Sequence, residues 1–284
     1  MPGPRPRAFA QVDVFASTPL GGNPVAVVLD ADDLDEERMA AFARWTNLSE
    51  TTFVLPSDSG AADYRLRIFT PGGELPFAGH PTLGSAHAWL AAGGVPRDPD
   101  LLVQDCAAGP VRVRRTGPPT PLAFAAPPVL RSGPLDDELL RRVATALRVP
   151  AEAVLAHQWV DNGPGWAAVE LASAEAVLAL EPDFSGAGDL KVGVLGRYPD
   201  GHPLHWEVRA FAPGLGLGED PVTGSLNAAV AQWLLREGRT PLRYRVGQGH
   251  RVGRSGVVEI EQDAAGTVWV GGATTTLVQG TVTL

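Results

Sequence analysis

Two segments place titratable or hydroxyl side chains just before stretches that read as uncharged helices. Gly79-His80-Pro81 precedes one such stretch, and Asp220-Pro221-Val222-Thr223-Gly224-Ser225 precedes the other. The first N–H groups of a helix have no partner inside the helix, and they attract anions. Both segments are therefore typical of a site that binds a carboxylate or a phosphate next to a group that titrates.

At the first segment, a helix is expected over residues 81–92. Pro81 suits its first position, because the missing N–H costs nothing there. His80 is then expected at the cap, with a titratable ring, and Gly79 next to it.

At the second segment, a helix is expected over residues 223–236. The backbone N–H groups of Gly224 and Ser225 are open to an anion, and Asp220 adds a carboxylate to the same end. Taken singly, His80, Asp220 and Thr223 are ordinary helix caps. Their matching places in two repeats favour a functional interpretation.

Glu50 is the third candidate for chemistry. It lies in Asn47-Leu48-Ser49-Glu50-Thr51-Thr52-Phe53, between an amphipathic helix expected over 33–45 and an apolar strand. A carboxylate that enters an apolar strand is costly unless it is paired, and this environment suits proton transfer. The alternative is a solvated turn acid.

The chain repeats itself. Arg67-x-Phe69-Thr70-Pro71-Gly72 returns as Arg209-x-Phe211-Ala212-Pro213-Gly214, an offset of 209 − 67 = 142 in a chain of 284 residues. At the same offset, 24–29 matches 166–171. Two copies of one domain are therefore expected, and a cleft between duplicated halves is where a site is expected. At this offset the counterpart of Glu50 is Val192, which cannot carry a proton.

The predicted fold class is α+β. Gly and Pro, 33 and 26 residues, divide the chain into short elements, which favours strands. Residues 81–94 and 222–235 contain no Asp, Glu, Lys or Arg, and a helix that is apolar all round is buried. Each domain is therefore expected to be a curled, mostly antiparallel sheet around one buried helix.

Domain boundaries and the smaller motifs are less sharply defined. We expect one domain over 1–128, completed by a strand near 275–284, and the other over 129–274, with the crossover near 126–133. Residues 116–121 are either a hairpin turn or the linker. Glu74 and Glu219 are expected as turn acids or acids between the domains, with a catalytic role as the alternative. Gln248-Gly249-His250 is expected as a plain turn, with a peripheral ligand contact as the alternative.

Composition excludes several classes of function. The formal net charge of −9 argues against a nucleic-acid partner. The single cysteine, Cys106, excludes an internal disulfide, a cysteine zinc cluster and a pair of catalytic thiols. The six histidines show no metal-binding spacing, and the phosphate-loop, nucleophile-elbow and dinucleotide fingerprints are absent from the sequence. No signal peptide or membrane span is recognisable, so a cytoplasmic protein is expected.

At these residues the chain resembles the phenazine-biosynthesis isomerase-like (PhzF-like) family. The matching blocks are Asp13-Val14-Phe15, Gly22-Asn23-Pro24, 47–51, 67–84, 209–225, Gln248-Gly249 and Gly253-Arg254. The resemblance implies a diaminopimelate-epimerase-like fold of two pseudo-symmetric domains, a homodimer and no cofactor or metal. It also implies an isomerase that acts on a small carboxylate-bearing metabolite of the dihydro-hydroxyanthranilate type.

The resemblance also implies roles for individual residues. Glu50 would be the proton shuttle, while His80 and Asp220 would orient the substrate and relay protons. Ser225 and the Gly224-Ser225 amides would hold the carboxylate, and Gly79 would line the opposite helix start. Further substrate-binding or pocket-lining candidates are Thr223, Asn23, Trp45, Trp159, Asp161 and Asn162.

Two other functions remain open at this point. One is an epimerase or racemase that acts on an amino or hydroxy acid. The other is a non-catalytic protein that binds small acids, although mere binding does not need Glu50.

Overall fold

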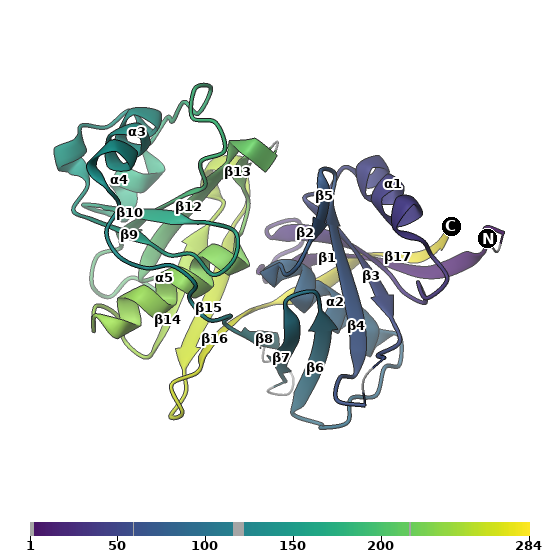
Figure 1. Ribbon diagram of the computed structural model, residues 1–284. Helices are drawn as coiled ribbons and strands as arrows, with labels where there is room; N and C mark the ends of the chain where they lie inside the picture. The colour runs from purple at the N-terminus through teal and green to yellow at the C-terminus, as the bar shows by residue number, and fades with distance from the viewer. Residues whose placement is uncertain (1–2, 59, 116–121, 216) are drawn as a thin grey trace. The chain divides into compact units, whose positions relative to one another are not determined.

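A computed structural model of the chain describes residues 3–58, 60–115, 122–215 and 217–284. The chain forms two compact units, 1–125 with 271–284, and 126–270 (Figure 1). The predicted domain boundaries lie within a few residues of these limits. Residues 116–121, read as a turn or a linker, lie outside the part that the structure describes.

The first unit is built mainly of strands, with two helices. Its elements are β1 (Pro6–Val14), β2 (Asn23–Val28), α1 (Glu36–Thr46), β3 (Glu50–Leu55), β4 (Tyr64–Thr70), β5 (Gly73–Leu75), α2 (Gly79–Ala91), β6 (Leu101–Cys106), β7 (Gly109–Arg114), β8 (Leu122–Ala125) and β17 (Thr274–Thr283). The strands pair in the order β17-β1-β2-β3-β4-β6-β7-β8, and β5 pairs with β4. The β2–β3 and β4–β6 pairs are parallel.

The second unit repeats this plan. Its elements are α3 (Asp137–Leu147), η1 (Ala151–Ala153), β9 (Ala156–Trp159), β10 (Ala167–Leu171), α4 (Ala174–Leu178), β11 (Val192–Arg197), β12 (Trp206–Ala212), η2 (Pro213–Leu215), β13 (Leu217–Asp220), α5 (Gly224–Arg236), β14 (Arg243–Gln248), η3 (His250–Val252), β15 (Gly256–Gln262) and β16 (Val268–Gly272). The order is β9-β10-β11-β12-β14-β15, with β13 on β12, and β10–β11 and β12–β14 are parallel.

The strand register preserves the 142-residue offset. Val25 lies opposite Glu50 in the first unit, and Ala167 lies opposite Val192 in the second. Tyr64 lies opposite Gln104, and Trp206 lies opposite Val246. Each pair differs from its counterpart by 142 at both positions. The sequence repeat is thus a repeat of strand pairing, and Val192 occupies the place of Glu50.

Each unit has one core helix. Helix α2 buries Gly79 to Ala86 and Ala88 and packs against β1, β2, β3, β8 and β17, and these strands surround it in Figure 1. Helix α5 has most of its residues buried and packs against β15. A helix that is buried on most sides has no face on which charged side chains can reach water. This burial explains why both core helices are largely uncharged. The predicted α+β class, with one buried helix in each half, is confirmed.

The repeated arginine makes the same bond in both units. Arg67 on β4 forms a two-pronged bond to Glu74, at 2.7 and 2.6 Å, and Arg209 on β12 forms one to Glu219, at 3.0 and 2.7 Å. Each guanidinium also lies over the ring two residues ahead, 5.1 Å from the Phe69 centroid and 5.0 Å from the Phe211 centroid. The expected turn acids therefore close the hairpins β4–β5 and β12–β13.

A few elements differ from the expected ones. The helix expected over 33–45 begins at Glu36, as α1. Helices α1 and α3 begin where an aspartate accepts a bond from the backbone: Asp35 from Arg38 N, and Asp136 from Leu139 N. Cap geometry fixes such ends more tightly than hydrophobic spacing does. The short elements β5, β8, β13 and α4 carry too few residues for a periodic signal.

We call each two-pronged arginine–glutamate bond a fork. Removal of the arginine is expected to lower the free energy of unfolding by different amounts in the two forks. The side chains of Arg209 and Glu219 are 5% and 8% exposed, whereas those of Arg67 and Glu74 are 18% and 29% exposed. We expect Arg209→Met to lower the free energy of unfolding by about 3–5 kcal/mol, because it leaves a buried carboxylate without its partner. Arg67→Met, the matched control, should cost about 1 kcal/mol or less because water screens its partner. Equal losses in urea unfolding would contradict this account.

Candidate active site

In the first unit, Glu50 and His80 lie side by side. Glu50 is the first residue of β3, and His80 is the second residue of α2. His80 Nε2 is 3.3 Å from Glu50 Oε2, and the side chains are 4% and 13% exposed. A carboxyl group buried beside an imidazole has the surroundings that a general acid or base requires. The structure thus brings together two of the three predicted catalytic residues.

The sequence around Glu50 fixes the start of its strand. Helix α1 ends at Asn47, which adopts the left-handed conformation with φ 55° and donates its N–H to Ala43 O. Asparagine tolerates this conformation better than most residues. The chain then turns into β3, and Glu50 enters the sheet opposite Val25. The predicted turn before an apolar strand is therefore a helix C-cap that delivers a carboxylate.

The Gly22-Asn23-Pro24 segment supports His80 from the other side. A Cβ atom on Gly22 would lie 2.1 Å from Val14 O, so only glycine fits there. The Gly22 N–H also donates to the Asp13 carboxylate, at 3.1 and 3.2 Å. Pro24 then offers its backbone to the His80 ring. Asn23, a predicted substrate-binding residue, is fully buried at the first position of β2.

Close packing sets the position of α2 against the sheet. A Cβ atom on Gly84 would lie 2.3 Å from Val25 Cγ1, so glycine lets the helix approach β2. The Ser85 hydroxyl lies 2.8 Å from that of Thr52, two residues after Glu50 on β3. Thr82 donates to Ala78 O at 2.9 Å. The Ser85 contact thus holds the second turn of the helix against the strand that carries Glu50.

The helix start differs from the predicted one. Gly79 is the first residue of α2, His80 the second and Pro81 the third, so His80 is not at the cap and Pro81 is not at the first position. Pro81 is still tolerated, because the N–H groups of the whole first turn have no partner inside a helix. The residue before the helix, Ala78, has only a methyl side chain and cannot cap it.

Burial controls the charge of His80. It lowers the pKa of the ring to about 3, and the backbone hydrogen bond with Pro24, which favours the protonated ring, offsets only part of this effect. His80 is therefore neutral near pH 7. A ring with so low a pKa stays neutral beside Glu50, so it can orient the carboxyl group but does not take its proton.

In the second unit, Asp220 and Thr223 form a polar pair before α5. Thr223 Oγ1 donates to Asp220 Oδ2 at 2.5 Å. Thr223 is the residue that precedes the helix, so the helix begins at Gly224 and not at Thr223 as predicted. The Thr223 hydroxyl is therefore engaged with Asp220 instead of capping α5.

Ser225 is the second residue of α5 and is held from two directions. Trp166 Nε1 donates to Ser225 Oγ at 3.1 Å, and Asn162 Nδ2 donates to Ser225 O at 2.9 Å. Because the hydroxyl oxygen already accepts a bond, its own proton is directed elsewhere. Together with the N–H groups of Gly224 and Ser225, this hydroxyl can donate to a carboxylate.

Gln248 contacts two of the predicted site residues, Asp220 and Thr223, and the sequence analysis did not predict these contacts. It is the last residue of β14 and is fully buried, so the plain turn predicted at 248–250 is wrong for this residue. It accepts bonds from Thr223 N and Asn227 Nδ2, and it donates to Asp220 O and Thr223 Oγ1. A buried glutamine next to a glycine was the signal that could have revealed it.

The other predicted pocket residues are in varied surroundings. The Trp45 side chain is 79% exposed and stacks on Phe42. Trp159 lies under the Arg131 guanidinium, 3.6 Å from the ring centroid. Asp161 Oδ1 accepts from Gly163 N and Gly165 N, so it shapes the turn before Trp166. Asn162 differs from these three, because it donates to the predicted site residue Ser225.

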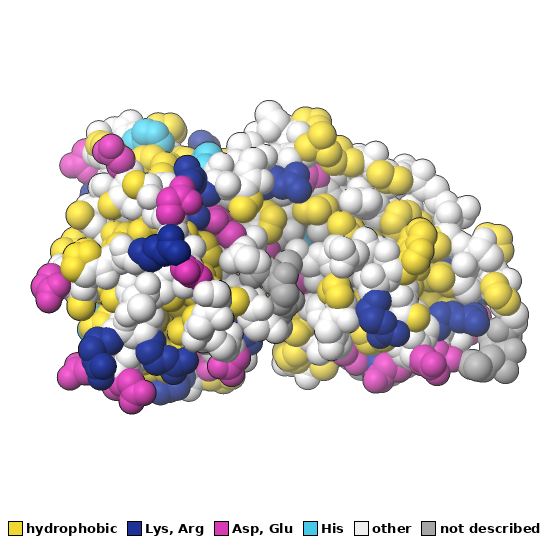
Figure 2. Space-filling model, turned by 90° about the horizontal axis from the view of Figure 1, so that it is seen from above, with side chains coloured by type: hydrophobic (Ala, Val, Ile, Leu, Met, Phe, Trp, Pro, Cys, Tyr) yellow, Lys and Arg dark blue, Asp and Glu magenta, His cyan; other side chains and the backbone are white. Residues whose placement is uncertain are grey.

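No group of three or more His, Cys, Asp or Glu side chains that could hold a metal ion occurs among the described residues. None of the described helices is long and apolar enough to cross a membrane. On the face shown in Figure 2, acidic and basic side chains lie interspersed.

Known proteins share this sequence and this fold. The family model described as "Phenazine biosynthesis-like protein" matches residues 12–280. The chain belongs to this family. It is 37% identical to the trans-2,3-dihydro-3-hydroxyanthranilate isomerase of Pseudomonas aeruginosa, over 91% of each chain. It is 35% identical to the Schizosaccharomyces pombe protein called antisense-enhancing sequence 1, over 96% of this chain and 97% of that protein.

A solved structure agrees with the family assignment. The PhzF-family phenazine biosynthesis protein of Enterococcus faecalis superposes with a TM-score of 0.80 at 27% identity, covering 99% of this chain and 100% of that one. The resemblance found in the sequence and the predicted fold class are thus confirmed. Several family relatives are named isomerases, and the chain is an isomerase of this family.

Burial of His80 predicts a loss of stability in acid. The pKa of His80 is about 3 in the folded chain and about 6.5 in the unfolded one, so the unfolded state alone takes up the proton between these values. The free energy of unfolding should fall as pH drops through this window, by up to about 1.4 kcal/mol per pH unit. Urea unfolding of the parent and of His80→Gln between pH 7 and pH 4 measures it, and the variant should lack this part of the slope.

His250 provides a control of opposite sign. Its hydrogen bond to Glu207 raises the pKa of His250, so its stabilising contribution is complete below the unfolded pKa and is lost as pH rises through the folded one. His250→Gln should therefore remove stability in acid, where His80→Gln restores it. Parallel pH slopes for the two variants would refute the assignment for His80.

Proposed function

We propose that this isomerase moves a proton between two carbon atoms of a small carboxylate-bearing metabolite, without a cofactor, and that Glu50 is the general acid and base. The observation that carries the proposal is the contact between Glu50 and the buried His80, at 3.3 Å. The isomerase relatives support a substrate of the dihydro-hydroxyanthranilate type.

In the proposed step the substrate loses one proton from carbon and regains one at another carbon, so no other reactant is needed. The Glu50 carboxylate takes a proton from one ring carbon, and the electron pair of that C–H bond moves into the adjacent double-bond system. Glu50, now protonated, returns the proton to a second carbon, and a ketone remains after tautomerisation. His80, neutral at pH 7, orients a polar group and holds the carboxyl proton in place.

The start of α5 suits the carboxylate of such a substrate. Three hydrogen-bond donors lie there: the backbone N–H groups of Gly224 and Ser225 and the Ser225 hydroxyl. Trp166 Nε1 donates to the hydroxyl oxygen, which leaves the hydroxyl proton free to point to the substrate. Asp220 orients a polar group of the substrate, and Gly79 at the start of α2 lines the site. That both helix starts act on one substrate stays a prediction from the sequence.

The repeat favours isomerisation over racemisation. Val192 takes the place of Glu50 in the strand register, and Ser225 takes the place of His80 as the second residue of its helix. The equivalent positions therefore hold one acid–base pair, whereas racemisation by two bases needs one on each face of the carbon. An epimerase would have to use Asp220 as its second base.

Glu50→Gln tests the central role. We expect kcat to fall by about 10²–10⁴, because the amide cannot accept the proton from carbon. Incorporation of deuterium from heavy water into product, followed by NMR with a dihydro-hydroxyanthranilate as substrate, measures the step. The exposed Glu37→Gln is the matched control and should retain full activity. Label exchange by Glu50→Gln at the parent rate would exclude Glu50, and inversion at a single carbon would indicate an epimerase.

Trp166→Phe tests how the carboxylate is held. The phenyl ring keeps most of the apolar contact but cannot donate to Ser225 Oγ, so the hydroxyl proton is no longer directed to the substrate. We expect KM to rise about fivefold to tenfold, as for the loss of one hydrogen bond of about 1 kcal/mol, with little change in kcat. Ser225→Ala should act in the same direction. A change in kcat alone would contradict a binding role.

The expected homodimer and cytoplasmic location also stay proposals. Light scattering on the purified chain tests the first, since a dimer has twice the 29.8 kDa mass of the chain.

A further inference from the structure

We infer that Gln248 is a positioning residue, which acts through the Thr223 hydroxyl to orient the Asp220 carboxylate. This inference rests on the role proposed for Asp220. Gln248 lies in the second unit, its side chain is buried, and in the described contacts it touches neither Glu50 nor His80.

The donors and acceptors along this chain of groups allow one direction only. Gln248 Nε2 donates to Thr223 Oγ1 at 2.9 Å, so that oxygen accepts a bond and the hydroxyl proton must point elsewhere. The hydroxyl lies 2.5 Å from Asp220 Oδ2, which as a carboxylate only accepts. The amide of Gln248 therefore sets the direction in which Thr223 donates.

The same amide also anchors the backbone on both sides of this pair. Gln248 Nε2 donates to Asp220 O at 3.1 Å, and Gln248 Oε1 accepts from Thr223 N at 3.0 Å. Oε1 accepts in addition from Asn227 Nδ2 at 2.8 Å, one turn into α5. One side chain thus ties the end of β13 to the first turn of α5.

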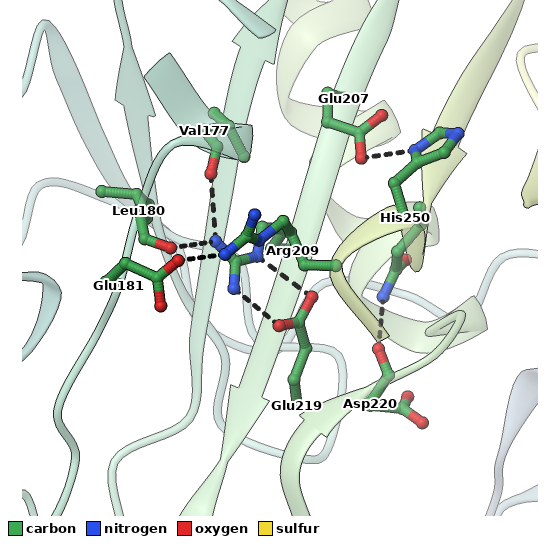
Figure 3. A network of polar contacts seen from close by, with 10 residues as sticks. Val177, Leu180, Glu181, Glu207, Arg209, Glu219, Asp220 and His250 are labelled. Carbon is green, nitrogen blue, oxygen red and sulfur yellow. Dashed lines mark hydrogen bonds and ion pairs between the residues drawn. The ribbon is translucent and has the colours of Figure 1, made fainter. Parts of the chain in front are cut away.

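The backbone after Gln248 keeps the amide in place. Gly249 has φ 94°, and a Cβ atom there would lie 2.6 Å from Pro221 O, so the turn runs directly against the segment between Asp220 and Thr223. The next residue, His250, is bonded through Nδ1 to the fully buried Glu207 at 2.9 Å (Figure 3). The amide has little freedom to leave its partners.

The first unit lacks this chain of polar groups although it shares the scaffold. In the strand register, Leu75 takes the place of Asp220 and Cys106 takes the place of Gln248. Ala78 precedes α2 where Thr223 precedes α5. Three positions change together from apolar or weakly polar to strongly polar. Because the first unit folds with the apolar set, the polar set serves something other than the fold.

Two charged neighbours of the pair have partners of their own. Glu219, next to Asp220, is bonded to Arg209 at 3.0 and 2.7 Å. Glu207 on β12 is bonded to His250 and to Tyr198. A change in the titration of Asp220 after substitution of a neutral neighbour therefore reports the hydrogen bond from Thr223.

The test is a double-mutant cycle on Thr223 and Gln248, read by ¹³C NMR of the Asp220 carboxyl carbon. Thr223→Val should move its titration midpoint upward by about one pH unit, because a hydrogen bond donated to the carboxylate favours the ionised form. Gln248→Met should move it in the same direction. The double variant should move it no further than Thr223→Val alone, and Thr223→Ser should restore the parent value.

Additive shifts, or an unchanged midpoint in Gln248→Met, would overturn the inference. If Gln248→Met does not fold, Gln248→Glu replaces it; its charge acts in both Thr223 backgrounds and cancels in the cycle, so the coupling is still measured. Gln104→Met is the matched control, since Gln104 is equally buried and bonds to Thr82 in the first unit. It should lower the melting temperature and leave the Asp220 midpoint unchanged.

This readout is independent of turnover. Coupled shifts at Asp220 with an active Glu50→Gln enzyme would refute the proposed function and leave the positioning role intact. An inactive Glu50→Gln enzyme with additive shifts at Asp220 would do the reverse.

Discussion

The fork between an arginine and a glutamate is the interaction on which both halves of this enzyme depend. In each unit it ties the central strand to the short strand that leads into the core helix. Glu74 precedes Gly79 by five residues, and Glu219 precedes Gly224 by the same five. The fork therefore fixes where each core helix begins. In the second unit Arg209 also donates to Val177 O and Leu180 O, which draws α4 to the same point (Figure 3).

Since the forks give both helices the same start, function must come from what differs there. The second helical residue is His80 in one unit and Ser225 in the other. The first residue of the strand is Glu50 in one and Val192 in the other. A duplicated scaffold supplies two equal frames, and under the proposed function a few substitutions suit one to proton transfer and the other to holding an anion.

The sequence predicts features that depend on residues close together in the chain better than features that depend on residues far apart. The repeat and the two buried helices could be predicted because they depend on local composition and spacing. The roles of Glu50, His80 and Ser225 came from the family resemblance and stay predictions. The position of His80 within α2 could not be predicted in this way. The preference of proline for the first helical position favours a start at Pro81, whereas the helix begins at Gly79. Gln248 was misread as part of a turn because its partners, Asp220 and Thr223, are distant in sequence.

The two core helices also show why such a site needs a strongly determined scaffold. Ala78 cannot cap α2, and Thr223 bonds to Asp220 instead of capping α5, so neither helix gains the usual capping bond of about 1 kcal/mol. Burial of a neutral histidine beside a carboxyl group is a further cost. A helix that was stable only through its own caps could not bear these costs. Here the surrounding strands and the forks hold each helix, and its first N–H groups stay available to a ligand.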